Sequence, residues 1–287
     1  MRAHVQWILA MFPVLFACEV GLAEASDRAV CNWSVSNPRP AGPTDVGYED
    51  LDPRLRDPEN PNYAPGPDSL LAYIQIDKLH HGHMYIQDRS TGAQREVVMG
   101  FQPRWAPDGS LIACRVWISP DCMSQLRFIS PRSDDSLVPN VPCRAENYRW
   151  SPDSRSLAVA ALLPHSDMQA LYWIEIPSGR ARLLDTLTVF SDYQDLTWSP
   201  DSRAVVVTRV TDVEVEGEPL ASDLWLFDSS GRRCQLTRTS DYIESEPKWI
   251  DAKHVLYARR KAAEPDLGDP ERRVITIQRA RGGTKSE

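Results

Sequence analysis

Two groups of acidic residues beside a tyrosine occur at matching offsets in this sequence, and residues of these types could bind a ligand. One group lies just before Trp198 and the other just before Trp249. Carboxylates gathered at one end of a channel attract a cation or a basic peptide. The predicted binding residues, placed at the mouth of a central channel, are Asp192, Tyr193, Asp195, Asp241, Tyr242 and Glu244. The alternative is that both groups lie in ordinary solvated loops.

A histidine cluster is the second set of residues that could do chemistry. His80, His81 and His83 lie close together, and three imidazoles at this spacing could hold a transition metal. Neighbouring side chains alternate in direction, however, and we expect no carboxylate or thiol beside them. The sequence therefore predicts a solvated connecting loop, with no metal site and no cofactor.

A repeated phrase indicates the elements that position these residues. Trp-Ala-Pro-Asp or Trp-Ser-Pro-Asp begins at Trp105, Trp150 and Trp198, and a shorter Trp-Ile-Asp copy begins at Trp249. The four tryptophans lie 45, 48 and 51 positions apart, which is typical of four-stranded propeller blades. We expect each tryptophan to pack between neighbouring blades rather than to bind a ligand.

The aspartate of each phrase is predicted to stabilise a turn. Proline presets the φ angle of a tight turn, and the aspartate side chain can close it with a hydrogen bond to the backbone. Because the residue recurs at the same place, a turn explains every copy, whereas a calcium or acid-base site would explain one. The aspartates are Asp68, in an early copy without tryptophan, and Asp108, Asp153 and Asp201.

Two strand-like segments follow each phrase. The first is almost continuously apolar, as in residues 204–208, and fits an inner strand covered on both faces. The second alternates apolar and polar residues, as in 223–228, and runs into a hairpin turn. Five copies follow residue 66, so we predict an all-β fold: a β-propeller of five four-stranded blades, or six if the N-terminal segment and the tail complete another.

The repeat resembles that of the TolB-type β-propellers. The shared pattern is Trp-Ser-Pro-Asp, Gly or Ser, an apolar strand, a second strand ending in Asp or Pro, and then Ser-Gly. The resemblance covers about residues 66–287. It implies a periplasmic protein whose propeller docks partner proteins, in the best-known case the peptidoglycan-associated lipoprotein and other envelope components. The sequence lacks room for a separate α/β domain ahead of the propeller, which leaves the specific TolB role open.

The residues before the repeats include a predicted targeting signal. Residues 1–25 have a basic start, an apolar run and an Ala-Glu-Ala site, as a signal peptide does. The alternative is lipoprotein processing, with a lipid anchor on Cys18. Residues 26–65 form a proline-rich lead-in that could supply a closing strand, and residues 66–287 form the propeller. Five cysteines remain after removal of the leader, so at least one has no disulfide partner.

The composition and the motifs of the sequence limit the classes of function that it could have. The net charge is -8 and the pI about 5.3, so the surface should repel nucleic acid. The sequence contains no Gly-x-Ser-x-Gly elbow, no phosphate-binding glycine loop and no His-Glu-x-x-His motif. We therefore predict a non-catalytic, secreted or periplasmic scaffold that binds protein partners at the cell envelope, with no transmembrane segment.

An enzyme or a small-ligand binder is the alternative. Propeller enzymes gather catalytic residues from several blades, so they need no local motif. A hydrolase, or a protein that binds a carbohydrate or another small ligand, would then have its site in the acidic channel mouth. A third possibility, the regulatory propeller of a prolyl oligopeptidase-like peptidase, would require a hydrolase domain after residue 287.

Overall fold

The computed structural model describes residues 33–45, 63–65, 70–118, 124–141, 144–163, 168–187, 196–213, 219–262 and 269–279. All regular secondary structure in these ranges is β-strand, which confirms the predicted all-β class. They contain no helix, and hence none that could cross a membrane. The predicted leader, with Cys18, lies outside the described residues.

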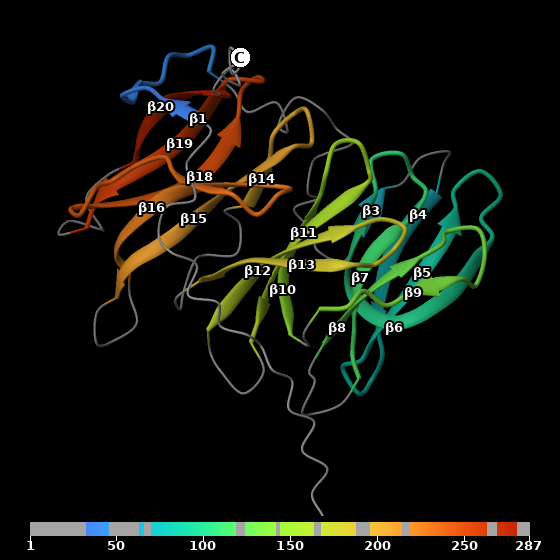
Figure 1. Cartoon of the computed structure of the whole chain (residues 1–287). Helices are drawn as coiled ribbons and strands as arrows, with labels where there is room; N and C mark the ends of the chain where they lie inside the picture. The colour runs from blue at the N-terminus through green and yellow to red at the C-terminus, as the bar shows by residue number, and fades with distance from the viewer. Residues whose placement is uncertain are drawn as a thin grey trace, which may run out of the picture.

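The strands form successive groups of four, which follow one another in chain order (Figure 1). Group 1 contains β3 (Tyr63–Pro65), β4 (Leu70–Ile76), β5 (Gly82–Asp88) and the first half of β6 (Gln94–Trp105). Group 2 contains the second half of β6, β7 (Ile112–Val116), β8 (Gln125–Ile129) and β9 (Ser136–Leu137). Group 3 contains β10 (Ala145–Trp150), β11 (Ser156–Leu162), β12 (Gln169–Glu175) and β13 (Ala181–Leu187).

The later groups follow the same antiparallel order. Group 4 contains β14 (Leu196–Trp198), β15 (Ala204–Val213), β16 (Pro219–Asp228) and β17 (Arg233–Gln235). Group 5 contains β18 (Tyr242–Trp249), β19 (His254–Lys261), β20 (Glu271–Arg279) and β1 (Trp33–Val35), with β2 (Arg39–Pro40) also beside β20. Such groups have the strand order of propeller blades. The number of blades in the ring and its closure stay predictions.

The strand that carries the tryptophan is the first of its group, and these first strands lie next to one another. β6, β10, β14 and β18 make contact in that order. The apolar strand that follows each phrase is therefore the second of its group, an inner strand as predicted. It is also covered on both faces. In β15, Val205 and Val207 pack toward group 3, whereas Ala204 and Val206 pack toward group 5.

Apolar clusters fill the space between consecutive groups. One lies between groups 1 and 2, one between 2 and 3, one between 3 and 4, and one between 4 and 5. Their members include the fully buried side chains of Phe128, Leu157 and Leu226. Each such side chain stabilises the fold by roughly 1.5–3 kcal/mol. Because each group shares a cluster with its neighbour, no group holds a complete core of its own.

Two of the repeated tryptophans join neighbouring groups by hydrogen bonds as well as by packing. Trp150 Nε1 donates to the carbonyl oxygen of Arg104 at 2.9 Å, and Trp198 Nε1 donates to that of Arg149, also at 2.9 Å. Trp198 is 1% exposed. The predicted packing role of these side chains is confirmed.

The aspartates close the turns, as predicted. The Oδ1 atoms of Asp108 and Asp153 accept backbone N–H groups two residues later, at 2.9 and 3.1 Å. The turns of neighbouring groups are also hydrogen-bonded to each other, because the Oγ of Ser154 accepts the N–H of Asp108 at 2.9 Å. Ser202 accepts the N–H of Asp153 at 3.0 Å in the same way. Asp201 also closes its turn, whereas Asp68 lies outside the described residues.

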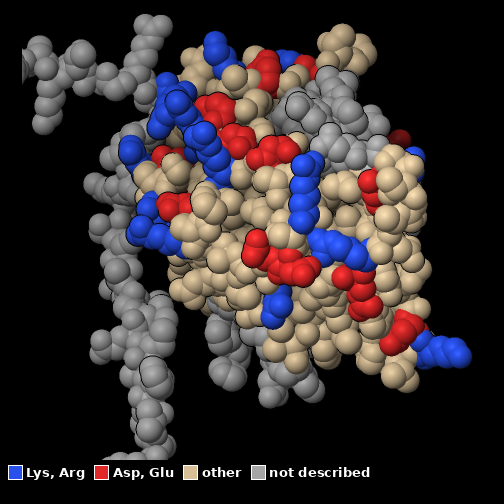
Figure 2. Space-filling view, turned by 90° about the vertical axis from the view of Figure 1, so that its right-hand side faces the viewer, with Lys and Arg blue, Asp and Glu red and all other residues tan. Residues whose placement is uncertain are grey.

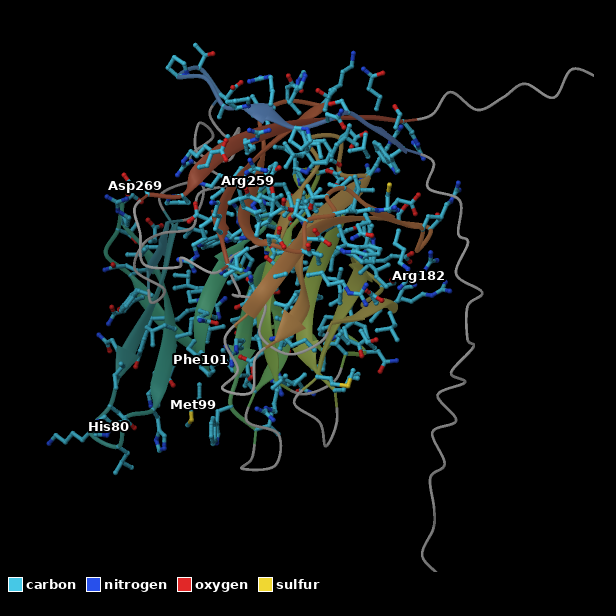
Figure 3. The ribbon with its side chains drawn as sticks, turned by 90° about the vertical axis from the view of Figure 1, so that its left-hand side faces the viewer. His80, Met99, Phe101, Arg182, Arg259 and Asp269 are labelled. Atoms are coloured by element: carbon cyan, nitrogen blue, oxygen red, sulfur yellow. The ribbon has the colours of Figure 1, made fainter. Side chains whose placement is uncertain are left out.

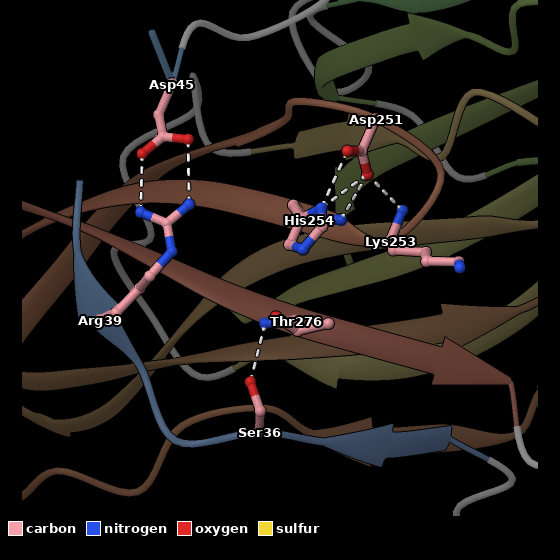
Figure 4. Close-up of polar contacts among 7 residues, drawn as sticks. All are labelled: Ser36, Arg39, Asp45, Asp251, Lys253, His254 and Thr276. Atoms are coloured by element: carbon pink, nitrogen blue, oxygen red, sulfur yellow. Dashed lines mark hydrogen bonds and ion pairs between the residues drawn. The ribbon is translucent and has the colours of Figure 1, made fainter. Parts of the chain in front are cut away.

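The N-terminal segment joins the last group. β1 runs antiparallel to β20, and the Thr276 N–H donates to Ser36 Oγ at 3.2 Å beyond the strand (Figure 4). Arg39 then forms a two-point ion pair with Asp45, which holds the pKa of that carboxyl at about 2. Segments far apart in the sequence are thus fastened together.

Two cysteines lie in the described chain, and they differ in state. Cys114 is a fully buried free thiol, and burial raises its pKa to about 12. Cys234 is disulfide-bonded. A buried thiol with so high a pKa is unreactive, so Cys114 acts here as a small apolar side chain.

Candidate functional site

Half of the predicted binding residues lie in the described chain, at the junction of β17 and β18. Asp241 is exposed, and its carbonyl oxygen accepts the N–H of Ala262 at 3.0 Å. Tyr242 is half-buried under the Arg259 guanidinium, whose central carbon lies 4.5 Å from the ring centre. The structure therefore keeps Asp241 open to a ligand and occupies one face of Tyr242 with a cation. Asp192, Tyr193 and Asp195 lie outside the described residues.

Glu244 is enclosed rather than facing a channel. It has no exposed surface. Its N–H donates to Ser222 Oγ at 2.8 Å, and the Ser222 hydroxyl donates to the Glu244 carbonyl oxygen at 2.7 Å. The Glu244 carboxyl group contacts the hydroxyls of Thr237 and Thr239, the latter at 3.2 Å. These contacts fasten β18 of group 5 to β16 of group 4, where Ser222 and Ile243 form a parallel bridge.

A second buried carboxylate, Asp223, shares this polar pocket. It is 4% exposed and accepts the side-chain amide of Gln235 at 2.7 Å and the N–H of Thr239 at 2.9 Å. Its third contact is the Thr237 hydroxyl, at 3.4 Å. The hydroxyl of Thr237 therefore stands between two carboxyl groups, although it has only one proton to donate.

Protonation of Glu244 completes this network. The pKa of Glu244 is raised to about 7, first because burial disfavours its charge and further because of the nearby Asp223 carboxylate. When Glu244 is neutral, its own O–H can donate to Thr237, which leaves the Thr237 proton for Asp223. Thr237 Oγ1 also accepts the N–H of Leu224 at 2.8 Å, so both of its lone pairs are then used.

Charged side chains of β19 and β20 continue the polar layer. Glu271 accepts hydrogen bonds from Arg259 Nε at 2.8 Å and from Arg273 Nη1 at 2.9 Å. Both bonds lower the pKa of Glu271, and the bond from Arg273 has the larger effect. Arg273 Nη2 donates to the Pro38 carbonyl oxygen at 2.7 Å, which ties in the N-terminal segment. Arg259, the cation beside Tyr242, is thus paired with Glu271.

The enclosed carboxyl pair can hold a proton near neutral pH. A general acid must also come within hydrogen-bond distance of a substrate, however. Glu244 has no exposed surface, and Asp223 is almost as deeply buried. As it stands, the pair serves to join groups 4 and 5.

The histidine cluster has carboxylate neighbours, contrary to expectation. His83 Nδ1 lies 2.8 Å from Glu96 Oε1, and His83 Nε2 lies 3.3 Å from Asp77 Oδ2. Both contacts raise the pKa of His83, and the contact with Glu96 has the larger effect. Asp77 also caps the turn by accepting the N–H groups of Leu79 at 2.7 Å and His81 at 2.9 Å, and its pKa falls to about 2. Within the described ranges, no three such side chains are placed to hold a metal ion.

A cluster of exposed apolar side chains lies beside this turn. The β4–β5 hairpin ends at the Ile76–Gly82 pair, and β6 and β7 pair up to Gly100 and Val116. Both ends meet at Gly82 and Gly100, because a Cβ on Gly82 would lie 2.9 Å from the Gly100 carbonyl oxygen. We call the exposed residues of this end the apolar tip: Ile76 (62% exposed), Leu79 (72%), Met99 (40%), Trp117 (49%) and Ile118 (45%).

The figures place this end relative to the rest of the molecule. Figure 3 shows His80 and Met99 at the same end of the blue-green strands, with Arg182 on the other side of the molecule. Figure 2 shows basic and acidic side chains interspersed over one face, so the net acidic charge is not concentrated there. The sequence motifs do not indicate the apolar tip. Its signal in the sequence is the pair of large apolar residues Trp117 and Ile118, which continue beyond the paired part of β7.

Comparison with known proteins bears on the fold. No family model and no curated protein matches the sequence. The tricorn protease is similar in structure at a TM-score of 0.52 and 16% identity, over 69% of this chain and 18% of that chain. The β-propeller domain of the Trilobed protease from Pyrococcus furiosus is similar at a TM-score of 0.53 and 15% identity, over 74% of this chain and 66% of that chain.

TolB is also among the similar solved structures. TolB from Acinetobacter baumannii matches at a TM-score of 0.42 and 15% identity, over 76% of this chain and 54% of that chain. Identities this low establish the fold alone. The described chain has the β-propeller fold.

Proposed function

We propose that this chain is a secreted β-propeller of five blades, without chemistry of its own, that binds a protein partner at the cell envelope. The apolar tip is the observation that carries the proposal. Large apolar side chains gathered on a surface mark an interaction site, and tryptophan is enriched where binding energy is concentrated. Trp117 and Leu79 lie in this cluster at 49% and 72% exposure.

One predicted acidic residue, Asp241, fits the same end of the repeat. Met99 lies where group 1 passes into group 2, and Asp241 lies at the corresponding junction of groups 4 and 5. A partner that covers both would present apolar side chains to the tip and basic side chains to Asp241. The composition of the first 25 residues supports secretion, with anchoring through Cys18 as the alternative, and the TolB-like repeat supports a periplasmic location.

Capture of cross-linked partners tests the proposal. The protein, tagged at its C-terminus, is compared with a variant carrying Leu79→Ser and Trp117→Ser and with a control carrying Leu183→Ser. Leu183 is as exposed as the tip residues, at 45%, but lies next to Arg182 on the other side of the molecule. A partner retained by the control and lost by the tip variant supports the proposal. A partner retained by both contradicts docking through the tip.

A small-ligand binder or hydrolase is the second candidate, favoured by the Asp223–Glu244 pair. Two neighbouring carboxyl groups are a common acid-base arrangement. Opening of the contact between groups 4 and 5 would be needed to expose Glu244. Turnover of small glycosides that is lost in Glu244→Gln but kept in the exposed-site control Glu175→Gln would favour this candidate.

A further inference from the structure

A small pocket lies between groups 1 and 2, apart from the residues discussed above. Its volume is about 150 Å³. It lies toward the outside of the groups, between the outer strand of group 1 and the last two strands of group 2. Its lining residues are Val97, Val98, Arg127, Ile129, Asp134 and Ser136.

Arg127 brings a guanidinium group to this apolar contact. It pairs with Cys114 across β7 and β8, and Ile129 follows two residues later, so all three point to the same face. Cys114 and Ile129 belong to the apolar cluster between groups 1 and 2. Arg127 is therefore directed into a contact that is otherwise apolar.

Arg127 is half-buried, and its guanidinium group is enclosed on the Nε side. Arg127 Nε is buried without an acceptor, and Arg127 has no hydrogen bond or ion pair within the described chain. A buried cationic donor without an acceptor is costly, and arginine is rarely buried unless it is paired. The Arg127 Nε–H group is therefore free to donate to an acceptor that enters the pocket.

The carboxylate nearest to this pocket is held by another arginine. Asp134 is fully exposed and lies 3.3 Å from Arg95 Nη1. Arg95 Nη2 donates to the carbonyl oxygens of Ser130, Pro131 and Ser133 at 3.2, 3.0 and 3.1 Å, which fixes the β8–β9 turn. Asp134 therefore stays at the rim, and Arg127 remains available.

We propose that this pocket binds a small aliphatic carboxylate. The carboxylate would accept from Arg127 and from the hydroxyl of Ser136, which pairs with Ile129 and so shares its face. The hydrocarbon part would pack on Val97, Val98 and Ile129. A cavity near 150 Å³ holds a molecule about the size of benzene, so the ligand has roughly six to eight heavy atoms.

The charge of the site selects a carboxylate over a phosphate. One guanidinium balances one negative charge, whereas a phosphate dianion would leave a surplus beside Asp134. Half of the lining residues are apolar side chains that phosphate cannot use. The proposal does not depend on the protein partner or on the apolar tip.

Calorimetric titration with isovalerate, cyclopentanecarboxylate, the uncharged analogue isovaleramide and inorganic phosphate tests the proposal. We expect at least one carboxylate to bind, with at least about tenfold weaker binding of the amide and of phosphate. Arg127→Gln should lower the carboxylate affinity by at least about tenfold, and Ser136→Ala by a few-fold. Arg89→Gln, at an exposed arginine outside the pocket, should leave it unchanged.

Three results would overturn the proposal. They are no binding of either carboxylate to the wild-type protein, equal binding of isovalerate and isovaleramide, and unchanged affinity in Arg127→Gln. Circular dichroism of each variant establishes that it is folded. If Arg127→Gln does not fold, Ser136→Ala and the comparison of acid with amide still decide the question.

Discussion

Asp223 and Glu244, from neighbouring strand groups, lie on either side of the Thr237 hydroxyl in a pocket closed to solvent. The two carboxyl groups come from β16 and β18, so their contact joins group 4 to group 5. Because one hydroxyl proton cannot serve two carboxylates, this contact is best satisfied when Glu244 holds a proton. The strength of the contact between these two groups should therefore depend on pH.

Glu244→Gln should remove this dependence. Glu244 has a pKa of about 7 in the folded protein against an ordinary value of 4.5, so between these values the folded protein binds more protons than the unfolded chain. Its contribution is present below pH 4.5 and is lost as the pH rises through 7, by up to roughly 3 kcal/mol. Urea unfolding from pH 5 to pH 8.5 should show a smaller loss of stability in Glu244→Gln than in the wild-type protein.

Glu175→Gln is the control for this measurement because Glu175 is exposed. It should keep the pH dependence of the wild-type protein. Equal pH dependence in Glu244→Gln and the wild-type protein would contradict a proton held by Glu244.

The indole N–H of Trp198 should contribute measurably to stability. Trp198→Phe removes the hydrogen bond to the Arg149 carbonyl and leaves part of a buried site empty. We expect a loss of about 1–3 kcal/mol in the free energy of unfolding by urea. Trp117→Phe changes an exposed ring and should cost less than about 0.5 kcal/mol. Similar losses at the two sites would argue against a special role of the repeated tryptophan.

Gly100 should not tolerate a side chain. A Cβ at this position would lie 2.5 Å from the Arg115 carbonyl oxygen, where β6 and β7 approach closely. Gly100→Ala should therefore lower the free energy of unfolding by about 1–3 kcal/mol, and the thermal midpoint should fall with it. At Gly42 the nearest atom would be 3.6 Å away, so Gly42→Ala is the matched control and should have little effect. A thermal midpoint unchanged in Gly100→Ala would mean that the strands can separate at no cost.

The His83 imidazole should titrate above its ordinary pKa of 6.5, because Glu96 and Asp77 stabilise its charged form. The turn contact is thus complete below pH 6.5 and weakens as the pH rises through the folded pKa. An NMR titration of the imidazole resonances measures this value directly. Glu96→Gln should lower it, whereas Glu175→Gln should not. A His83 pKa below 6.5 in the wild-type protein would contradict the contact.

Local features of this fold could be predicted from the sequence because they recur at short range. Trp150 and Asp153 stand in one phrase, and their packing and turn roles follow from residue type and position alone. The order of the strands in a group is harder to predict. An apolar segment such as 204–208 indicates that both faces of the strand are covered, but it does not indicate which strand precedes it. The bulge in β6, with Gln102 at a φ of 53°, has no sequence signal at all.

The site depends on contacts between distant strands, which residue patterns do not specify. Glu244 follows Tyr242 by two residues, as Asp195 follows Tyr193, yet its burial follows from Thr237 and Asp223 on the neighbouring group. Glu96 reaches His83 across a strand pair whose register shifts at Met84, so a reading along the chain finds no carboxylate there. The exposure of Trp117 likewise depends on where pairing of β7 stops.

Site-specific photo-cross-linking tests the central claim, that a partner docks on the apolar tip, most directly. A benzophenone amino acid replaces Trp117 in one protein and Leu183 in another; the two positions are 49% and 45% exposed and lie in different parts of the fold. We expect that, in cells that produce the protein, position 117 yields a discrete cross-linked partner and position 183 does not. The same partner at both positions, or a partner at position 183 alone, would contradict it.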